Sequence, residues 1–420
     1  MILVLVEEIT NRIQTTFDFI FKLRGIHYEL TTSVEFFEES SFKKFNYTQH
    51  KSRSFSIQPS ALLQENEWRE QRISKALFED EECLSFDEII DPIASIFYVL
   101  TRFEEYNSTK MDEHNRFPFS ESILKKYDWI ERAKCDRWAK QIIELTHLSL
   151  PQNETEIVPT FDIDNTFAYQ LKRGKQKYLS ILKDVIRLNI NRLSERKKVQ
   201  KGEVDPYDTF ATIKNVALRF PKTKLFWLVG KRAKKDRNIS LSIAEHQALI
   251  KEMDAVAEVN LHPSYASNDD FSTILKEKKA LEDVLGRKIS SSRQHFLRLQ
   301  LPTTFQALQK AEFSHEYSMG FAEALGFRCG TARAHQWFDL SKNEVTELTV
   351  HPFVYMDGTL NEYMKLSVEQ SKMKIKELYC EVKQYGGDFV FLWHNETIGN
   401  YGIWKGWSEV LDFTLNLEDE

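Results

Sequence analysis

Short apolar runs alternate with amphipathic stretches along the chain from residue 154 onward. Each run has the length of a strand, and the stretches between runs have the apolar spacing of helices. Strands that alternate with helices predict a parallel sheet with crossover helices. The expected strands lie within 157–164, 224–230, 255–264, 288–296, 326–331, 346–353 and 388–395.

The first part of the chain has a different pattern. It opens with the apolar run MILVLV, and the segment 86–106 is helical by the spacing of its apolar residues around 93–100. A second amphipathic stretch, 136–148, is followed by Pro151 and polar residues, which predict a helix end and a loop. We therefore expect a smaller α/β or α+β domain over 1–153 and a second domain over 154–420.

Composition excludes several classes of protein. The chain has 420 residues, 42% hydrophobic and 13% aromatic, which is too apolar for a disordered or collagen-like protein. Its 57 basic and 63 acidic residues give a net charge of -6, so its overall field does not favour nucleic acid.

The cysteines and the apolar runs indicate the compartment. Four cysteines at 83, 135, 329 and 380 fit neither a disulfide framework nor a zinc-knuckle spacing, which favours a reducing environment. The N-terminal apolar run is too short for a signal peptide, and no run is long enough to cross a membrane. We expect a cytoplasmic protein without a transmembrane segment.

Polar side chains follow several of the expected strands, at the edge where parallel barrels place their active sites. In TFDIDN, Asp162 and Asp164 are two residues apart and therefore share one face of a strand. A divalent metal on one carboxylate would leave the other free as a base toward water. The alternative is that both only cap the following helix, for which aspartate is well suited.

Three other runs end in histidine, each with two interpretations. His262 in LHPSYAS is either a metal ligand or a hydrogen-bond partner of a nearby loop. Arg293 and His295 in SRQHF share a strand face; they form either an anchor pair behind the site, or a substrate contact and a further ligand. His394 in LWHN either donates a proton to a leaving group or is a satisfied polar residue at the strand end.

The segment 172–201, here called the basic arm, has eleven Lys or Arg against Asp184 and Glu195, a balance of +9. One interpretation is a helical arm that is simply solvated. The other is a surface that contacts anionic glycan carriers or acidic lipid headgroups at the membrane periphery, assisted by Tyr178, Ile181 and Leu182.

Six segments in this order resemble the polysaccharide deacetylase superfamily, the NodB-homology fold of carbohydrate esterase family four. They are TFDID, LHPSYAS, SRQHFLRLQLPTTF, YSMGFAEALGFRCGT, HPFVYMDGTL and LWHN. The segments DPIASIFYVLTRFEEY and DEHNRF resemble the N-terminal domain of unknown function in its Bacteroidetes-type branch. The resemblance implies a distorted (β/α) barrel of about seven strands over 154–420 and a carbohydrate substrate.

The resemblance also implies roles for single residues. Asp162 would be the catalytic base, while Asp164 and His262 would be ligands of a divalent metal such as zinc. Arg328 in GFRCGT would orient the base, and His394 would be the general acid.

Other candidates come from residue type and position. Asp357 in MDGTL would support a catalytic side chain. The candidate substrate contacts are Arg293 and three aromatic residues that could stack on a sugar, Tyr265, Trp337 and Trp393.

One departure from the family pattern concerns the metal. The family has a second histidine four residues after the first, where this chain has Ala266. His295 would replace it, Ser267 or water would complete the shell, or the site would hold no metal.

The expected activity is metal-dependent hydrolysis of an N-acetyl group on a sugar or glycan intermediate, a carbon–nitrogen bond hydrolysis in the synthesis of surface glycans. Two alternatives stay open. One is a non-catalytic glycan-binding or scaffold protein on a degenerate deacetylase fold, and the other is a metal-free amidase.

Overall fold

The computed structural model describes residues 1–150 and 154–419. Its N-terminal part is built on a parallel sheet of four strands in the order β2–β1–β3–β4. The apolar run at the start of the chain forms an inner strand that is buried along its whole length, as expected for a strand covered on both faces. The elements of this sheet are β1 (Ile2–Val6), α1 (Asn11–Ile20), β2 (Tyr28–Thr31), α2 (Val34–Glu39), β3 (Lys43–Tyr47) and β4 (Phe55–Ser56).

A small antiparallel sheet and a buried helix complete the N-terminal part. The helix expected within 86–106 begins at Pro92, where a missing N–H costs nothing, and Asp91 accepts hydrogen bonds from the backbone N–H groups of Ile93 and Ala94. The residues before it form strands instead of helix. The elements are β5 (Ile73–Phe78), β6 (Glu81–Phe86), β7 (Ile89–Ile90), α3 (Pro92–Leu100), α4 (Ile123–Lys126) and α5 (Lys134–Leu145).

The C-terminal part contains a sheet of nine strands in the order β13–β14–β12–β11–β10–β9–β8–β16–β15. All neighbouring strands are parallel except β13 and β14. The expected α/β fold with a mostly parallel sheet is therefore confirmed. The strands are β8 (Ile157–Ile163), β9 (Lys224–Leu228), β10 (Glu258–His262), β11 (Ser291–Ser292), β12 (His315–Glu316), β13 (His335–Asp339), β14 (Glu344–Val350), β15 (Tyr355–Met356) and β16 (Phe389–His394).

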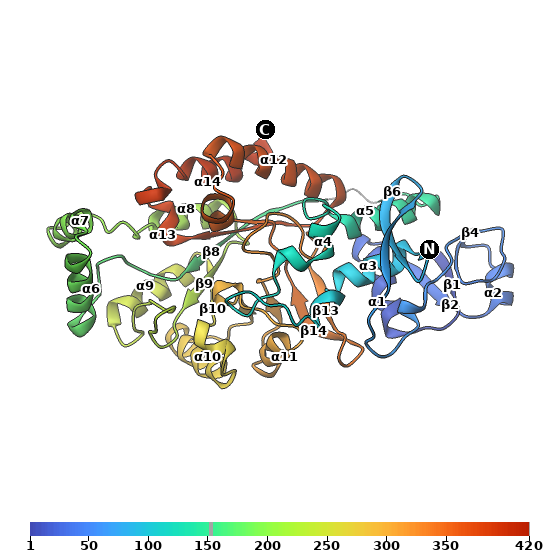
Figure 1. Ribbon diagram of the computed structural model, residues 1–420, viewed down its shortest axis with the longest axis horizontal. Coiled ribbons are helices and arrows are strands. Elements are labelled where there is room, and N and C mark those ends of the chain that lie inside the picture. Colours follow the sequence, from blue (N-terminus) through green and yellow to red (C-terminus); the bar gives the residue numbers. More distant parts are fainter. Residues whose placement is uncertain (151–153, 420) are drawn as a thin grey trace.

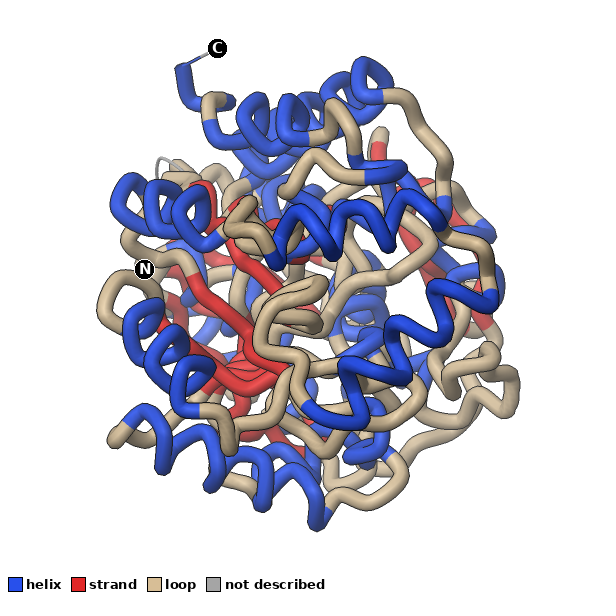
Figure 2. Tube along the Cα trace, turned by 90° about the vertical axis from the view of Figure 1, so that its left-hand side faces the viewer, coloured by secondary structure: helices blue, strands red, loops and turns tan. Residues whose placement is uncertain are grey.

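Helices cover both sides of this sheet (Figures 1 and 2). In Figure 1, α8, α12 and α14 lie above the strands, α9, α10 and α11 lie below them, and α6 and α7 stand at the left end of the molecule. Among the helices of the described residues, none is both long and apolar enough to cross a membrane. The helices are α6 (Gly174–Ile186), α7 (Ile190–Gln200), α8 (Phe210–Arg219), α9 (Ala244–Asp254), α10 (Ser272–Leu285), α11 (Thr303–Lys310), α12 (Val368–Tyr385), α13 (Asn395–Ile398) and α14 (Ser408–Leu415).

The strand expected at 326–331 is wrong, because that segment forms turns. Its backbone groups bond to the N-terminal part of the chain: the N–H of Phe327 donates to the carbonyl of Ile130, and the carbonyl of Gly330 accepts from Cys135. Gly326 has a φ of 112°, and a Cβ there would lie 2.1 Å from the Ile130 oxygen, so only glycine allows this approach.

The sheet is also not closed by strand pairing over the described residues. Its outer strands, β13 and β15, pair with one neighbour each and not with one another. The expected closure into a distorted barrel of about seven strands is therefore not shown.

The two parts of the chain share one hydrophobic core and several buried ion pairs. Arg328 bonds to both carboxylate oxygens of Glu105, and Arg137 does the same with Glu381. The domain boundary expected near residue 153 lies outside the described residues. The contacts show that the N-terminal part packs tightly against the sheet that carries the site.

Candidate functional site

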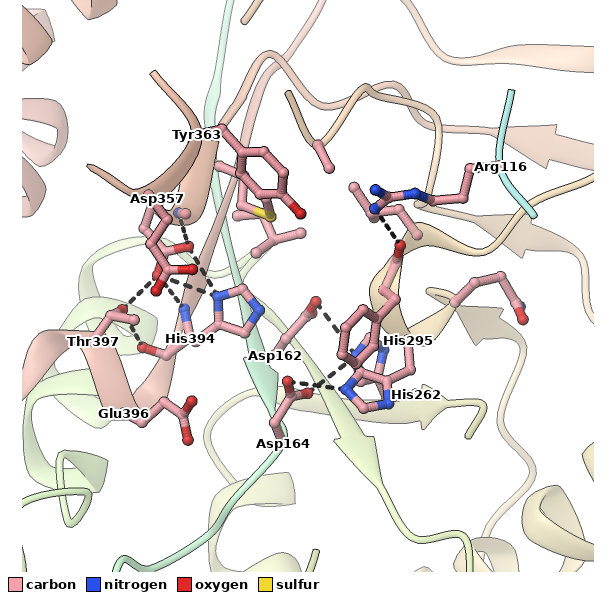
Figure 3. Close-up of a pocket in the computed structure, with 18 of the residues that line it drawn as sticks. Arg116, Asp162, Asp164, His262, His295, Asp357, Tyr363, His394, Glu396 and Thr397 are labelled. Carbon is pink, nitrogen blue, oxygen red and sulfur yellow. Dashed lines mark hydrogen bonds and ion pairs between the residues drawn. The ribbon is translucent and has the colours of Figure 1, made fainter. Parts of the chain in front are cut away.

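Several of the expected residues meet in a cavity of about 260 Å³ at the carboxyl ends of the parallel strands (Figure 3). Strand β8 carries Asp162 and is followed directly by Asp164, β10 ends at His262, and β16 ends at His394. β16 and β8 pair in register, with His394 opposite Asp162. His394 therefore lies on one side of the two aspartates, and His262 lies on the other side (Figure 3). His295 comes from the turn that follows β11.

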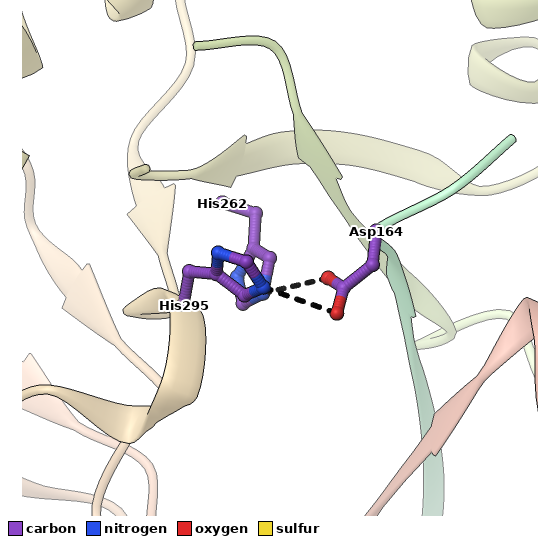
Figure 4. Close-up of side chains that lie close together, drawn as sticks. All are labelled: Asp164, His262 and His295. Atoms are coloured by element: carbon purple, nitrogen blue, oxygen red, sulfur yellow. Dashed lines mark hydrogen bonds and ion pairs between the residues drawn. The ribbon is translucent and has the colours of Figure 1, made fainter. Parts of the chain in front are cut away.

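Asp164, His262 and His295 form a compact group whose candidate ligand atoms all lie within 4.8 Å of one another (Figure 4). The Nε2 of His262 is 3.2 Å from Oδ1 of Asp164, and the Nε2 of His295 is 3.2 Å from Oδ2. Each imidazole is fixed through its Nδ1, by the carbonyl of Arg293 at 2.5 Å and by Oδ1 of Asp236 at 2.9 Å. Both rings therefore present Nε2 toward the same carboxylate.

The electrostatics of this group favour a positive charge. Burial opposes ionisation of Asp164, but His295 and His262 outweigh it and hold its pKa well below the usual range. Burial likewise opposes protonation of His295, but Asp164 and Asp236 raise its pKa to about 9. A proton or a metal ion can supply the charge that these groups stabilise.

The donor set fits a divalent metal. Two imidazole nitrogens and one carboxylate are the three protein ligands common in catalytic zinc sites. The Oδ1 of Asp164 is buried without a hydrogen bond, although it lies within ion-pair distance of His262. His295 thus supplies the third donor in a chain that has Ala266 after His262, and Asp236 orients it from behind, as carboxylates do for metal-binding histidines.

Asp162 is held by Arg293 and not by Arg328. The Nη1 of Arg293 donates to Oδ1 of Asp162 at 3.0 Å and to Oγ1 of Thr160 at 2.8 Å. Arg328 is buried away from the cavity and bonded to Glu105, so its expected role in orienting the base is wrong. Arg293 is itself completely buried, which excludes the direct substrate contact expected for it.

His394 is tied to Asp357. Its Nδ1 is 2.9 Å from Oδ1 of Asp357, and its backbone N–H donates to Oδ2 at 2.8 Å. Burial lowers the affinity of the ring for a proton, but the Asp357 carboxylate more than compensates and raises the pKa of His394 well above its usual value. Within the described part of the chain, Nε2 has no hydrogen-bond partner, and the ring lies on the cavity side of Asp357 (Figure 3).

The expected aromatic walls do not line the cavity. Trp393 is completely buried and donates its indole N–H to the Tyr355 hydroxyl, while Trp337 is buried on β13 beside Tyr106. Successive residues of a strand point to opposite faces, so a cavity-facing His394 places Trp393 in the core. Tyr265 is half-buried behind His295, where its hydroxyl is 3.2 Å from Nδ1 of His114.

The structure adds residues to which sequence analysis gave no role. Arg116, from the N-terminal part, lines the cavity, donates to the carbonyl of Phe296 at 2.9 Å and pairs with Asp112 at 2.7 Å. Glu396 lies beyond His394, and burial together with Asp164 raises its pKa. Arg116 lies in the segment DEHNRF, which the sequence singled out only by its resemblance, and no spacing signal pointed to Asp236.

Comparisons with known proteins found one family match and several similar structures. Residues 2–150 match the model of DUF7033, a family of unknown function. No curated protein sequence matches the chain. A putative polysaccharide deacetylase from Mycobacterium smegmatis has a similar structure, with 14% identity and a TM-score of 0.40 over 65% of this chain and 88% of that one.

Two further solved structures are similar. The polysaccharide deacetylase Bc1974 from Bacillus cereus has 10% identity and a TM-score of 0.31 over 63% of this chain and 88% of that one. PuuE allantoinase has 9% identity and a TM-score of 0.37 over 64% and 88%. The chain thus carries an N-terminal DUF7033 domain and is similar in structure to polysaccharide deacetylases over the larger part of its length.

Proposed function

We propose that the protein is a metal-dependent hydrolase that removes an N-acetyl group from a sugar or glycan intermediate. The observation that carries this proposal is the order of groups across one cavity. A metal-binding group of Asp164, His262 and His295 lies beside one carboxylate that Arg293 orients, and opposite a histidine that Asp357 keeps protonated. Amide hydrolysis needs a base, an acid and a means to stabilise an oxyanion.

Asp164, His262 and His295 would hold the ion, which we propose to be zinc. When bound, such an ion polarises an amide carbonyl, lowers the pKa of a water molecule and stabilises the oxyanion. The buried shell around the two histidines, with Asp236 and the Arg293 carbonyl, fixes both rings before any ion arrives.

Asp162 and His394 would move the protons. Oδ1 of Asp162 is occupied by Arg293, so Oδ2, which is 3.7 Å from Nε2 of His262, is the oxygen available to accept a proton from water. The water oxygen bonds to the acetyl carbon and the carbon–nitrogen bond breaks. His394 donates its Nε2 proton to the departing nitrogen, so that acetate and a free amine are formed.

The two alternatives receive less support from these contacts. A glycan-binding scaffold has no need for a buried arginine on Asp162 or for a carboxylate on His394. A metal-free amidase has no need for two imidazoles that present Nε2 to one carboxylate. Both remain distinguishable by experiment.

The proposal is tested by measuring metal content and acetate release on the same preparations. Wild type, Asp164→Asn and His295→Gln are compared by elemental mass spectrometry after incubation with zinc, with His315→Gln as a control histidine outside the group. We expect metal in the wild type and the control and its loss in the two ligand variants.

The same four proteins are then assayed for acetate release from N-acetylated sugars. Activity should follow metal content. A wild type that takes up no metal even from excess zinc would overturn the proposal. Turnover that survives chelation would favour the metal-free amidase, and saturable glycan binding without turnover would favour the scaffold.

A further inference from the structure

The basic arm forms a second cavity, which none of the proposed chemistry uses. It measures about 380 Å³ and lies between α6, α7 and the loop around 232–237. Asp184 is its one acidic lining residue among those described, and it pairs with Arg196 at 2.9 Å and Arg192 at 3.3 Å. The cationic lining residues are Lys172, Lys183, Arg187, Arg192, Arg232 and Arg237.

Four of these cations are not paired with a carboxylate in the described part of the protein. Over the described residues, Lys183, Arg187, Arg232 and Arg237 have no carboxylate partner within ion-pair distance. Burial lowers the pKa of Lys172 to about 8; Asp205 opposes this shift, and Arg192 and Arg232 add to it. A concave cluster of unpaired guanidinium and ammonium groups is the chemistry that binds phosphate oxygens.

The basic cavity shares a wall with the candidate metal site. Asn165 lines the basic cavity and follows Asp164 directly in sequence. Its Nδ2 donates to Oε2 of Glu396 at 3.0 Å, and Glu396 lines the cavity of the metal site. A residue that lines one cavity is therefore hydrogen-bonded to a residue that lines the other, so the two cavities are neighbours in the fold.

The opposite face of α6 is apolar and open to solvent. Tyr178, Leu182, Val185 and Ile186 are 73, 54, 48 and 72% exposed, and their spacing places them on one side of the helix. Leu188 and Ile190 extend this surface through the turn to α7, at 82 and 74%. We call these six residues the α6 apolar stripe. Exposed apolar residues beside a dense group of cations are typical of surfaces that enter an anionic lipid interface.

We propose that the substrate is a sugar carried on a membrane lipid through a phosphate or diphosphate, which binds in the basic cavity while the α6 apolar stripe enters the lipid surface. The inference rests on the proposed function for the sugar that would reach the metal site. The cationic lining of the basic cavity complements the negative charge of a phosphate. The α6 apolar stripe lies on the other face of the same helix, where it complements a hydrocarbon attached to that phosphate.

The phosphate site is tested with inorganic diphosphate as the probe, by calorimetry on the full chain at low ionic strength. The double variant Arg232→Gln/Arg237→Gln removes two unpaired cations of the cavity. Lys197→Gln/Lys198→Gln removes the same charge from exposed positions of the same arm. We expect saturable binding that falls at least about tenfold in the cavity variant and is nearly unchanged in the control. No saturable binding by the wild type, or an equal loss in both variants, would overturn the site.

The lipid contact is tested by co-sedimentation with vesicles of phosphatidylcholine, with and without phosphatidylglycerol. The wild type should bind only the anionic vesicles, and Leu182→Ser/Ile186→Ser should abolish that binding. Leu218→Ser, at a 72% exposed leucine of α8, serves as the control and should bind like the wild type. Diphosphate binding without vesicle binding would overturn the lipid-linked substrate in favour of a soluble sugar phosphate.

Both assays are repeated on Asp164→Asn, which should keep diphosphate and vesicle binding while it loses metal. This separates the two proposals. If both kinds of binding are present but no deacetylation is found, only the proposed function fails. If deacetylation proceeds while both kinds of binding are absent, only this inference fails.

Discussion

The guanidinium of Arg293 donates a hydrogen bond at 3.0 Å to Oδ1 of Asp162, from a position with no exposure to solvent. Its Nε donates to the carbonyl of Tyr317 at 2.9 Å, and the group lies 4.5 Å from the Phe226 ring centroid. The contacts with Tyr317 and Phe226 fix the guanidinium of Arg293, and the guanidinium in turn fixes the direction in which the Asp162 carboxylate points. A flexible cation could not supply this geometry.

Arg293→Lys should therefore lower turnover while the charge beside Asp162 is kept. A lysine cannot make the Tyr317, Thr160 and Asp162 contacts together, so the base would lose its orientation. We expect kcat to fall by about 10²-fold, with metal content unchanged, measured by acetate release and elemental mass spectrometry. Equal turnover in the variant and the wild type would show that Arg293 does not position the base.

Asp236→Asn should weaken metal binding without removing a ligand. The carboxylate accepts from His295 Nδ1 at 2.9 Å and from the backbone N–H of Tyr265 at 2.8 Å, which fixes the ring with Nε2 toward Asp164. Loss of this charge should reduce metal affinity by about 10- to 100-fold, measured by competition with a chelating dye. The nearby Asp269→Asn, an exposed carboxylate bonded to Arg298, should leave metal affinity unaltered.

Asp357→Asn should move the basic limb of the pH–rate profile to lower pH. His394 must be protonated to act as an acid, so activity is present below its pKa and is lost as pH rises through it. Burial disfavours the charged ring and Asp357 favours it, so removal of the carboxylate leaves a lower pKa. Glu362→Gln, in the same cavity but without a hydrogen bond to His394, should shift the limb less. An unmoved limb in Asp357→Asn would exclude His394 as the acid.

Glu105→Gln should destabilise the whole protein. Burial opposes the charge of Glu105, but Arg328 and Arg102 outweigh it and lower its pKa. The substitution leaves two buried guanidinium groups short of a counter-charge, so we expect a loss of about 3–5 kcal/mol in the free energy of unfolding, measured by urea denaturation. Glu245→Gln, which breaks an exposed pair with Arg173, should have no resolvable effect on the urea midpoint.

His246 should make stability fall in mild acid. It is fully buried, accepts a hydrogen bond from the Trp227 indole at 3.1 Å, and burial lowers its pKa to about 4. Since the unfolded histidine titrates at a higher pH, the unfolded state takes up the proton first. Stability is therefore complete above the unfolded value of about 6.5 and decreases as pH falls toward 4, by about 3 kcal/mol in all. His246→Gln should flatten this part of the stability profile, and an unchanged slope would contradict the assignment.

The ends of most of the parallel strands could be predicted from sequence because polar or ionisable residues closely follow each apolar run. Six of the seven runs contain a strand, and Asp162, Asp164, His262, His295 and His394 meet in one cavity. Which arginine orients Asp162 could not be predicted. Arg293 and Arg328 both lie at apolar runs, and only tertiary packing decides which of them contacts Asp162. The turns at 326–331 could not be predicted either, since their backbone partners lie near 130–135.

The alternation of side chains between the two faces of a strand could have excluded Trp393 as a wall of the cavity. Trp393 precedes His394, and neighbouring residues of a strand cannot both face the cavity. The burial of Arg293 was not readable in the same way, because its strand, β11, has only two residues before the chain turns.

Arg116 belongs to the N-terminal part of the chain, yet it lines the cavity of the metal site and holds the Phe296 carbonyl in the turn next to His295. The chemistry and the shape of the cavity are thus encoded in separate stretches of the gene. Exchange of the segment around 112–117 between homologous proteins would therefore alter which substrate fits, while the metal-ligand candidates stay as they are.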